Sequence, residues 1–217
     1  MPKNIMQMQK INYQQLTDEI IARETERYAA DGRRAKILLH ACCAPCASYV
    51  VPYLAEHFDV DVYFYNPNIA PREEYEHRLA ELYRLCSLLE TNGKLSVIEG
   101  EYEPDAYLAA ARGLEGEPEG GSRCTVCLGM RIGETARLAS LGDYDYFATT
   151  LTVSPHKNAP LINTLGEKYA EEYGVKWLPS DFKKKNGYLR SIETCREYGI
   201  YRQNYCGCLF AKGDDRI

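Results

Sequence analysis

The sequence predicts a three-layer α/β fold built on a parallel sheet of Rossmann type. Short apolar runs at 36–40, 60–65 and 95–98 alternate with longer segments whose apolar residues recur at helical spacing. The 217 residues, 45% hydrophobic and 26% charged, suit one globular domain and exclude disordered and fibrous classes. We expect the domain to span residues 31–217, preceded by an N-terminal extension over residues 1–30.

The first strand and its successor define a parallel β-α-β unit. Residues 36–40 (KILLH) are apolar, and residues 60–65 are rich in β-branched and aromatic side chains, so both are typical of buried strands. The intervening segment, residues 48–58, is short enough to hold a single crossover helix. Consecutive strands joined by a crossover helix run parallel.

A long helix is expected after Pro71 and before Asn92-Gly93. Its apolar positions step by four, three, four and three residues, which places them on one face. They are Tyr75, Leu79, Leu82, Cys86 and Leu89. Cys86 therefore has a structural role, and we assign the isolated Cys195 in the same way.

The other elements complete the alternation of strands and helices. The extension is expected to form an amphipathic helix with Leu16, Ile20 and Ile21 on its apolar face. The remaining predicted segments are a strand at 95–98, a helix near 105–112, a glycine-rich loop at 113–122, a helix at 127–141, a strand at 144–149, a helix at 158–173 and a strand at 175–178.

The cellular location of the protein determines which roles its nine cysteines can have. Residues 1–13 are polar and lack the apolar stretch of a secretory signal, and no apolar run approaches the length of a membrane span. We therefore expect a cytoplasmic protein with no membrane contact. Cytosolic thiols stay reduced unless they bind metal or work in redox chemistry, so a structural disulfide framework is disfavoured.

Seven cysteines form three tight groups that lie far apart in the sequence. The groups are Cys42-Cys43-Ala-Pro-Cys46, Cys124-Thr-Val-Cys127 and Cys206-Gly-Cys208. Such grouping indicates iron-sulfur or metal ligation by a site that folding assembles, with zinc as the main rival metal. The first two groups fall at predicted helix starts, where free N–H groups and the helix dipole favour thiolates.

Seven thiols exceed one four-ligand site, so the surplus needs a role. Our hypothesis assigns a cluster to Cys42, Cys43, Cys124 and Cys127, although consecutive residues of an extended backbone point apart. Two roles remain open for Cys206 and Cys208. They either bind a second metal together with Cys46 or close into a redox-active disulfide.

The C-terminal segment differs in charge from the rest of the chain. Residues 182–217 carry eight Lys or Arg against four Asp or Glu, a net charge of +4 in a chain of −5 overall. With their many tyrosines they suit RNA phosphates and an unpaired base, although a solvated charged face is an equal alternative. Asp181 and His156 are candidate proton donors, and His40 is expected to be a buried strand histidine.

Six ordered motifs between about residues 36 and 210 resemble the cobalamin-independent epoxyqueuosine reductases of the QueH type. They are Leu-Leu-His-Ala-Cys42-Cys43-Ala-Pro-Cys46, Tyr-Asn66-Pro67-Asn68-Ile, Arg-Cys124-Thr-Val-Cys127, Thr-Val-Ser154-Pro155-His156-Lys157-Asn158, Asp181-Phe182-Lys183-Lys184 and Tyr201-Arg202-Gln203-Asn204-Tyr205-Cys206-Gly207-Cys208.

The resemblance implies a cytoplasmic oxidoreductase of tRNA modification. Such an enzyme reduces epoxyqueuosine to queuosine at the wobble position of tRNAs with GUN anticodons, using electrons from an external low-potential donor. The resemblance also implies a [4Fe-4S] cluster, a neighbouring iron ion for which zinc is the alternative, and a fold similar to the adenine-nucleotide hydrolase (PP-loop-like) branch. Members can carry Asp where this chain has Cys46, and a thiolate there makes the second site softer.

Two other classes of protein share some of these features. A zinc-stabilised RNA-binding module without redox activity would also use cysteine groups beside a basic segment. A PP-loop-like tRNA thiolase or ligase would share the fold, but its phosphate loop would occupy the position of residues 42–46. No Walker A or dinucleotide-binding motif is present, which disfavours the second class.

Overall fold

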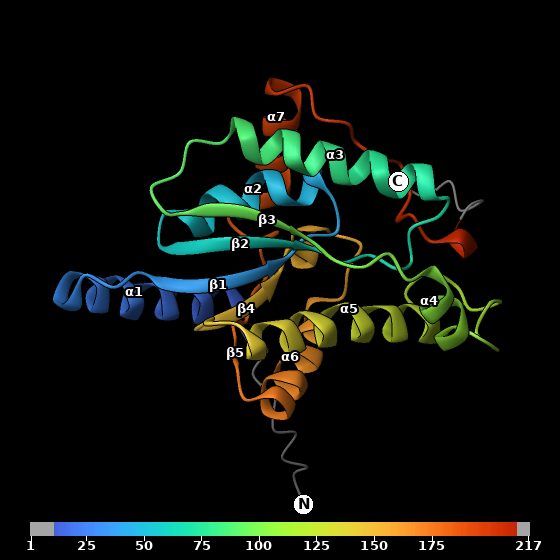
Figure 1. The fold of residues 1–217 in the computed structure, drawn as a ribbon, viewed down its shortest axis with the longest axis horizontal. Helices are drawn as coiled ribbons and strands as arrows, with labels where there is room; N and C mark the ends of the chain where they lie inside the picture. The colour runs from blue at the N-terminus through green and yellow to red at the C-terminus, as the bar shows by residue number, and fades with distance from the viewer. Residues whose placement is uncertain (1–10, 212–217) are drawn as a thin grey trace, which may run out of the picture.

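A computed structural model describes residues 11–211, which form a single five-stranded parallel sheet with helices on both faces (Figure 1). The strand order is β3-β2-β1-β4-β5, the order of the Rossmann fold. The predicted parallel α/β architecture is therefore confirmed. The strands are β1 (Ala35–His40), β2 (Phe58–Phe64), β3 (Leu95–Glu99), β4 (Tyr146–Thr149) and β5 (Lys176–Trp177).

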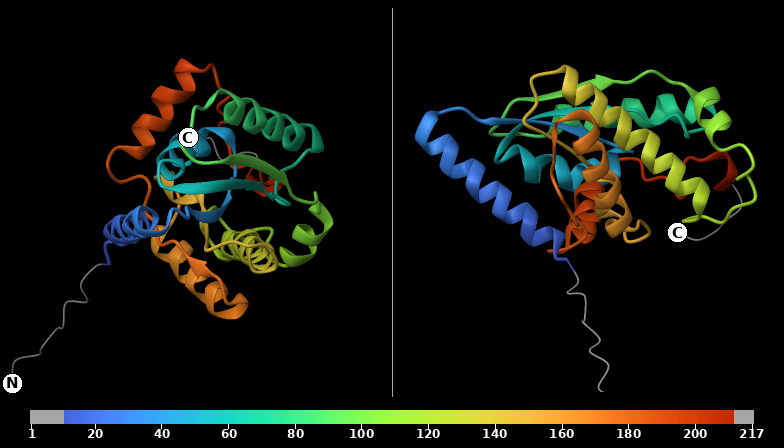
Figure 2. Two further views of the ribbon diagram at one scale, coloured as in Figure 1. Left: turned by 60° about the vertical axis from the view of Figure 1, so that its left-hand side comes forward. Right: turned by 90° about the horizontal axis from the view of Figure 1, so that it is seen from below.

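Helices α2, α3 and α7 cover one face of the sheet, and α5 and α6 cover the other (Figures 1 and 2). Strand alternation separates the two cores, since Ile37 and Leu39 face the first layer while Leu38 faces the second. The helices are α1 (Tyr13–Asp31), α2 (Ala44–Ala55), α3 (Arg72–Leu88), α4 (Pro104–Ala110), α5 (Ser122–Leu141), α6 (Ala159–Tyr173) and α7 (Gly187–Glu197), with short 3-10 turns η1 (Thr150–Val153) and η2 (Leu209–Ala211). Within the described residues no helix is both long and apolar enough to cross a membrane.

The chain reverses its direction of growth across the sheet between β1 and β4. From β1 it adds β2 and β3 on one side, and it then returns to add β4 and β5 on the other. Ligands bind beyond the carboxyl ends of the strands at such a switch point. The turns that follow β1 and β4 meet there, since the backbone N–H of Cys42 donates to Thr150 Oγ1 at 3.4 Å.

Helix α7 was not predicted from the sequence, and its packing explains why. Its buried residues are Gly187, Ser191 and Cys195, which are small and give no apolar periodicity. Small residues allow α7 to lie close to α2, where Ser48 Oγ donates to the Ser191 carbonyl at 3.3 Å. The other boundaries differ from the predictions by a few residues, the largest changes being the earlier starts of α2 and α5.

Helix α1 confirms a helix over the described part of the N-terminal extension, whose residues 1–10 lie outside the described range. The apolar face predicted for it is only partly correct. Ile21 is buried, but Leu16 and Ile20 are half-buried and the other buried positions are polar. Tyr146 Oη donates to Glu24 Oε1 at 2.6 Å, and Thr17 Oγ1 donates to the Pro179 carbonyl at 2.5 Å. The helix therefore docks through hydrogen bonds as well as apolar contact.

We predict that Gly166→Ala destabilises the fold by about 1–3 kcal/mol, the usual cost of overpacking a core. A Cβ at Gly166 in α6 would lie 2.2 Å from the Trp177 indole, which is itself buried. Chemical denaturation followed through Trp177, the only tryptophan, measures the change. Gly129→Ala is the matched control, because its Cβ would meet only the end of Tyr169 at 3.3 Å. Equal stability of the two variants would refute this account of the α6 packing.

Candidate metal and redox site

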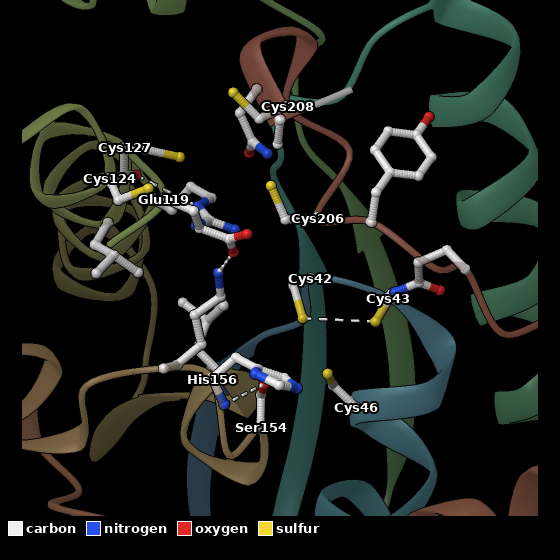
Figure 3. A pocket seen from close by; sticks show the side chains of 18 of the residues that line it. Cys42, Cys43, Cys46, Glu119, Cys124, Cys127, Ser154, His156, Cys206 and Cys208 are labelled. Atoms are coloured by element: carbon white, nitrogen blue, oxygen red, sulfur yellow. Dashed lines mark hydrogen bonds and ion pairs between the residues drawn. The ribbon is translucent and has the colours of Figure 1, made fainter. Parts of the chain in front are cut away.

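A cavity of about 360 Å³ opens beyond the carboxyl ends of β1 and β4, and side chains of all three cysteine groups line it (Figure 3). One wall is the turn from β1 into α2, the opposite wall is the start of α5, and the C-terminal segment lies between them. Folding thus brings together thiols that are separated by up to 166 positions in sequence. The cysteines that line the cavity are Cys42, Cys43, Cys46, Cys124, Cys127, Cys206 and Cys208.

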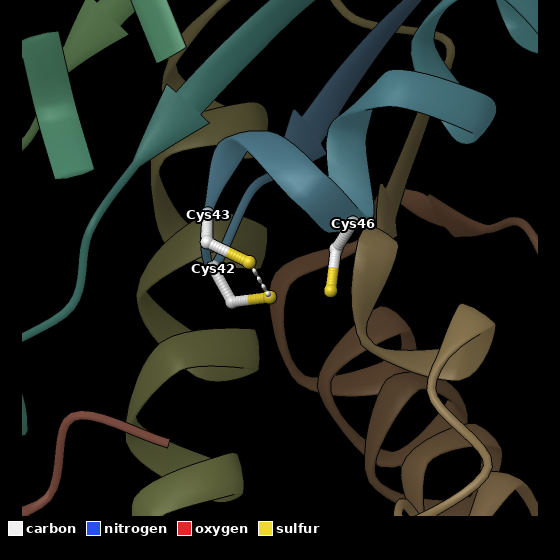
Figure 4. A group of neighbouring side chains, drawn as sticks. All are labelled: Cys42, Cys43 and Cys46. Carbon is white, nitrogen blue, oxygen red and sulfur yellow. Dashed lines mark hydrogen bonds between the residues drawn. The ribbon is translucent and has the colours of Figure 1, made fainter. Parts of the chain in front are cut away.

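The first group points its three sulfur atoms into one space (Figure 4). The Sγ atoms of Cys42 and Cys43 lie 3.6 Å apart, and the Sγ atoms of all three lie within 4.8 Å of one another. The expectation that the adjacent cysteines point apart is wrong, because the chain does not continue as a strand. Cys43 is the N-cap of α2 and Cys46 lies in its first turn, with Pro45 at the start of the helix.

The second group lies on α5, which begins at Ser122 and not at the predicted Cys127. Gly121 is the N-cap, so both cysteines belong to the first two turns. The Gly120 N–H donates to Cys124 Sγ at 3.2 Å, and Cys127 is buried. The backbone donor and the amino end of the helix suit an anionic sulfur ligand, whereas burial raises the pKa of the Cys127 thiol.

The third group is held against the loop that follows β2. The Ala70 N–H donates to the Gly207 carbonyl at 2.9 Å, and Ile69 forms a β-bridge with Cys208. Gly207 has a φ of 92°, and a Cβ there would lie 2.9 Å from Ile69 and 3.0 Å from Arg78. Glycine is therefore required between the two cysteines, both for the backbone conformation and for the close approach.

Buried tyrosine and cysteine meet at the third group. The Tyr107 hydroxyl of α4 lies 3.0 Å from Cys208 Sγ. The Cys206 thiol hydrogen-bonds to Cys208 and lowers the pKa of Cys208 to about 6, and the Tyr107 hydroxyl also lowers it.

In the first group, hydrogen bonds from Cys43 and Cys46 hold the pKa of Cys42 well below its usual range. Each of these two groups thus favours the thiolate form of one of its cysteines.

The other predicted site residues occupy different positions. His156 lines the cavity from the loop after η1 and is exposed. Asp181 is not among the residues that line the cavity, and its carboxylate pairs with Lys183.

His40 is the buried strand histidine that was expected. Its ring nitrogens lie 2.8 Å from Thr149 Oγ1 and 3.2 Å from the Tyr65 carbonyl. Burial lowers the pKa of His40 to about 4, which keeps the ring neutral.

Three functional candidates were missed by sequence reasoning. Arg131 and Tyr107 face the cavity from helices, and Asn68 lines it with a buried Oδ1 that has no hydrogen-bond partner in the described chain. Helical spacing places Arg131 one turn after Cys127, on the same face of α5, and this was an available signal. Asn68 belongs to the Tyr-Asn66-Pro67-Asn68-Ile motif, but nothing in its local sequence indicated that its side chain is buried.

The donor set fits both a single ion and a larger centre. A tetrahedral zinc ion with bonds of about 2.3 Å separates its thiolates by roughly 3.8 Å, which is close to the spacing of Cys42 and Cys43. Four more cysteines line the same cavity, enough thiols for a four-thiolate iron-sulfur cluster beside a second metal. A Rossmann-like α/β protein with a thiol-lined cavity at its switch point is well suited to metal-dependent redox chemistry.

The comparisons with known proteins agree with this class. The family model described as epoxyqueuosine reductase QueH matches residues 37–214. The epoxyqueuosine reductase QueH of Staphylococcus epidermidis is 47% identical over 95% of this chain and 87% of its own length. The proteins of the same name from Streptococcus pyogenes and Thermotoga maritima are 45% and 35% identical over 96% and 81% of this chain, and over 81% and 89% of their own lengths. The chain belongs to the epoxyqueuosine reductase QueH family and is an oxidoreductase of tRNA modification.

Solved structures resemble the chain only in the course of the backbone. NMN synthetase from Francisella tularensis aligns with 94% of this chain and 79% of its own, with a TM-score of 0.47 and 10% identity. NH3-dependent NAD synthetase from Campylobacter jejuni aligns with 87% of this chain and 86% of its own, with a TM-score of 0.35 and 15% identity.

We predict that Gly207→Ala releases the Cys206 and Cys208 thiols from the cavity. The added Cβ meets Ile69 and Arg78 and strains a left-handed backbone, so the segment shifts outward. In metal-free protein, the two thiols should react at least several-fold faster with a maleimide, as quantified by peptide mass spectrometry. Gly199→Ala is the control, because it also has a positive φ but nothing within 4 Å of its Cβ. Equal reaction rates in the two variants would refute the close-approach argument.

Proposed function

We propose that this protein reduces the epoxide of epoxyqueuosine to queuosine at the wobble position of tRNAs with GUN anticodons, in the cytoplasm. The observation that carries the proposal is the convergence of three cysteine groups on one cavity beside the basic, tyrosine-rich segment. Membership of the epoxyqueuosine reductase family supports the substrate. The chain would comprise the extension 1–30 and a reductase domain over residues 31–217.

The proposal assigns a [4Fe-4S] cluster to Cys42, Cys43, Cys124 and Cys127. These residues are the cavity-lining cysteines of β1–α2 and α5, which face each other across the cavity. Cys46 lies within 4.8 Å of Cys42 and Cys43, and with the reduced Cys206 and Cys208 of the same cavity it would hold a second metal, iron or zinc, beside the cluster. When bound, the cluster would relay single electrons from the external donor, and the second metal would polarise the epoxide oxygen as a Lewis acid.

Cys206 and Cys208 suit a redox role better than a purely structural one. Reduction of an epoxide to an alkene consumes two electrons and two protons and releases water. Oxidation of two thiols to a disulfide supplies that number of both, and an external low-potential donor must then reduce the disulfide again. The lowered pKa of Cys208 favours the reactive thiolate near neutral pH.

His156 is the better of the two candidate proton donors for the leaving oxygen. It lines the cavity, whereas Asp181 does not line it and pairs with Lys183. A general acid must come within hydrogen-bonding reach of the atom that it protonates. Asp181 would then serve to position the loop after β5.

The basic segment provides RNA contacts at the cavity. Arg202, Tyr188 and Tyr205 line it, so that a cation and two aromatic rings are available to a flipped nucleotide. Lys183 and Lys185 are less suited to this role, because they pair with Asp181 and Asp18. The rival class, a zinc-stabilised RNA-binding module without redox activity, conflicts with membership of a reductase family.

We predict that Cys124→Ser abolishes cluster loading and that Cys206→Ser abolishes multiple-turnover activity. A serine hydroxyl does not replace a thiolate as a cluster ligand or as a redox group. After anaerobic reconstitution, iron, zinc and acid-labile sulfide are quantified, and reductase activity is assayed on tRNA carrying epoxyqueuosine. Cys86→Ser is the control, since Cys86 lies on α3 outside the cavity. Full activity of Cys206→Ser would show that the role proposed for the C-terminal pair is wrong, and a zinc-only, colourless parent protein would favour the rival class.

We also predict that Arg202→Gln weakens tRNA binding by about tenfold and lowers its salt dependence by about one counterion, the usual effect of losing one phosphate contact. Lys168→Gln is the control, because this substitution removes one positive charge from α6, at a position that does not line the cavity. Filter binding over a range of salt concentrations measures both quantities. An equal loss of tRNA affinity in Lys168→Gln would mean that Arg202 acts only through the net charge of the protein and not through a direct phosphate contact.

A further inference from the structure

Arg131 is a deeply buried cation with no carboxylate partner in the described chain. It is 6% exposed, and the only side-chain hydrogen bond of Arg131 within the described residues runs from Nε to the Cys127 carbonyl at 3.3 Å. None of the ion pairs of residues 11–211 includes it. Removing an arginine from water is costly unless an anion compensates the charge. The two terminal nitrogens of Arg131 are therefore available to an anion in the cavity.

The carboxylate that lines the cavity does not supply this compensation. Glu119 is bound to Lys157, with Oε1 and Nζ 3.0 Å apart, so these two charges cancel each other. Arg78, which also lines the cavity, is paired with Glu74 at 2.7 Å. His40 is neutral, because burial lowers its pKa to about 4. Arg131 remains as an uncancelled positive charge in the interior.

The groups around Arg131 identify the class of anion. Arg131 lines the same cavity as the cysteines of all three groups, and its Nε donates to the carbonyl of Cys127. A centre held by several thiolates is a net anion, and its reduction adds a further negative charge. Net charge and hydrogen bonds to sulfur are among the factors that set the potential of an iron-sulfur cluster. Arg202 is exposed at the rim and is the better partner for a nucleic-acid phosphate.

We infer that Arg131 is a positioning residue that compensates the charge of the metal-thiolate centre and raises its reduction potential, so that the centre accepts electrons from the donor more readily. The inference rests on the proposed function, because it requires thiolate ligation at this cavity. It adds a cationic group to the site, contributed by the same helix that carries Cys124 and Cys127. Arg131 itself does not contact the reacting atoms in this scheme.

The test compares Arg131→Met and Arg131→Lys with Arg137→Met, which removes a guanidinium from the same helix at an exposed position paired with Glu134. Each protein is reconstituted anaerobically with iron and sulfide, and both elements are quantified. The midpoint potential is determined by a dithionite titration followed by absorbance and electron paramagnetic resonance. We expect Arg131→Met to load less iron and sulfide and to show a more negative midpoint potential, Arg131→Lys to restore part of the loss, and Arg137→Met to match the parent.

Thermal melting of the metal-free proteins separates this role from a structural one. Without a bound centre the arginine charge is compensated less fully, so Arg131→Met should cost the metal-free protein little or no stability, and the variant should be stabilised less than the parent on loading. Lower stability of the metal-free Arg131→Met protein, with unchanged loading and potential, would show that Arg131 is only structural.

Three further outcomes would overturn the inference. If Arg131→Met keeps the parent's iron, sulfide and potential but binds an anticodon stem-loop RNA more weakly, Arg131 holds a phosphate and not the centre. If the parent protein loads no iron and sulfide at all, the proposed cofactor is wrong and the inference falls with it. Normal loading of the parent with no effect of Arg131→Met refutes the inference alone.

Discussion

The parallel pairing of β1 with both β2 and β4 is the constraint on which the site depends. Residues 37–40 of β1 align with residues 146–149 of β4, so the two strands end level with each other at the centre of the sheet. β1 ends at His40, and only two residues separate it from Cys43, the N-cap of α2, which places Cys42, Cys43 and Cys46 at the switch point. Every other part of the site is arranged around this position.

The remaining two cysteine groups reach the switch point by different means. Helix α5 packs along the sheet through Leu128 and Ile132, and this packing presents its first turns to the cavity. The C-terminal segment has little regular structure and depends on specific contacts. Arg78 Nη2 donates to the Tyr205 carbonyl at 3.2 Å, and the guanidinium also lies over the Tyr205 ring. One buried arginine of α3 thus helps to fix the position of the Cys206 and Cys208 pair.

Sequence reasoning succeeded where a local pattern has one dominant cause. Apolar periodicity predicted α3 and the parallel core strands, because burial on one face imposes that spacing directly. It failed for α7 and for the buried face of α1, where small or polar residues are buried through close packing and hydrogen bonds. It also misjudged the directions of Cys42 and Cys43, which lie in the turn between the end of β1 at His40 and the start of α2 at Ala44.

The sequence by itself determined the fold class, the family and the identity of the seven thiols, since each rests on residue types at short spacing. Only the tertiary structure decided which groups meet, because proximity across long gaps depends on strand order and helix packing. It separated His156 at the cavity from Asp181 outside it. It also identified Arg131, which is buried and has no carboxylate partner among the described residues. Whether a buried arginine has a partner depends on three-dimensional packing, which no local pattern of residues encodes.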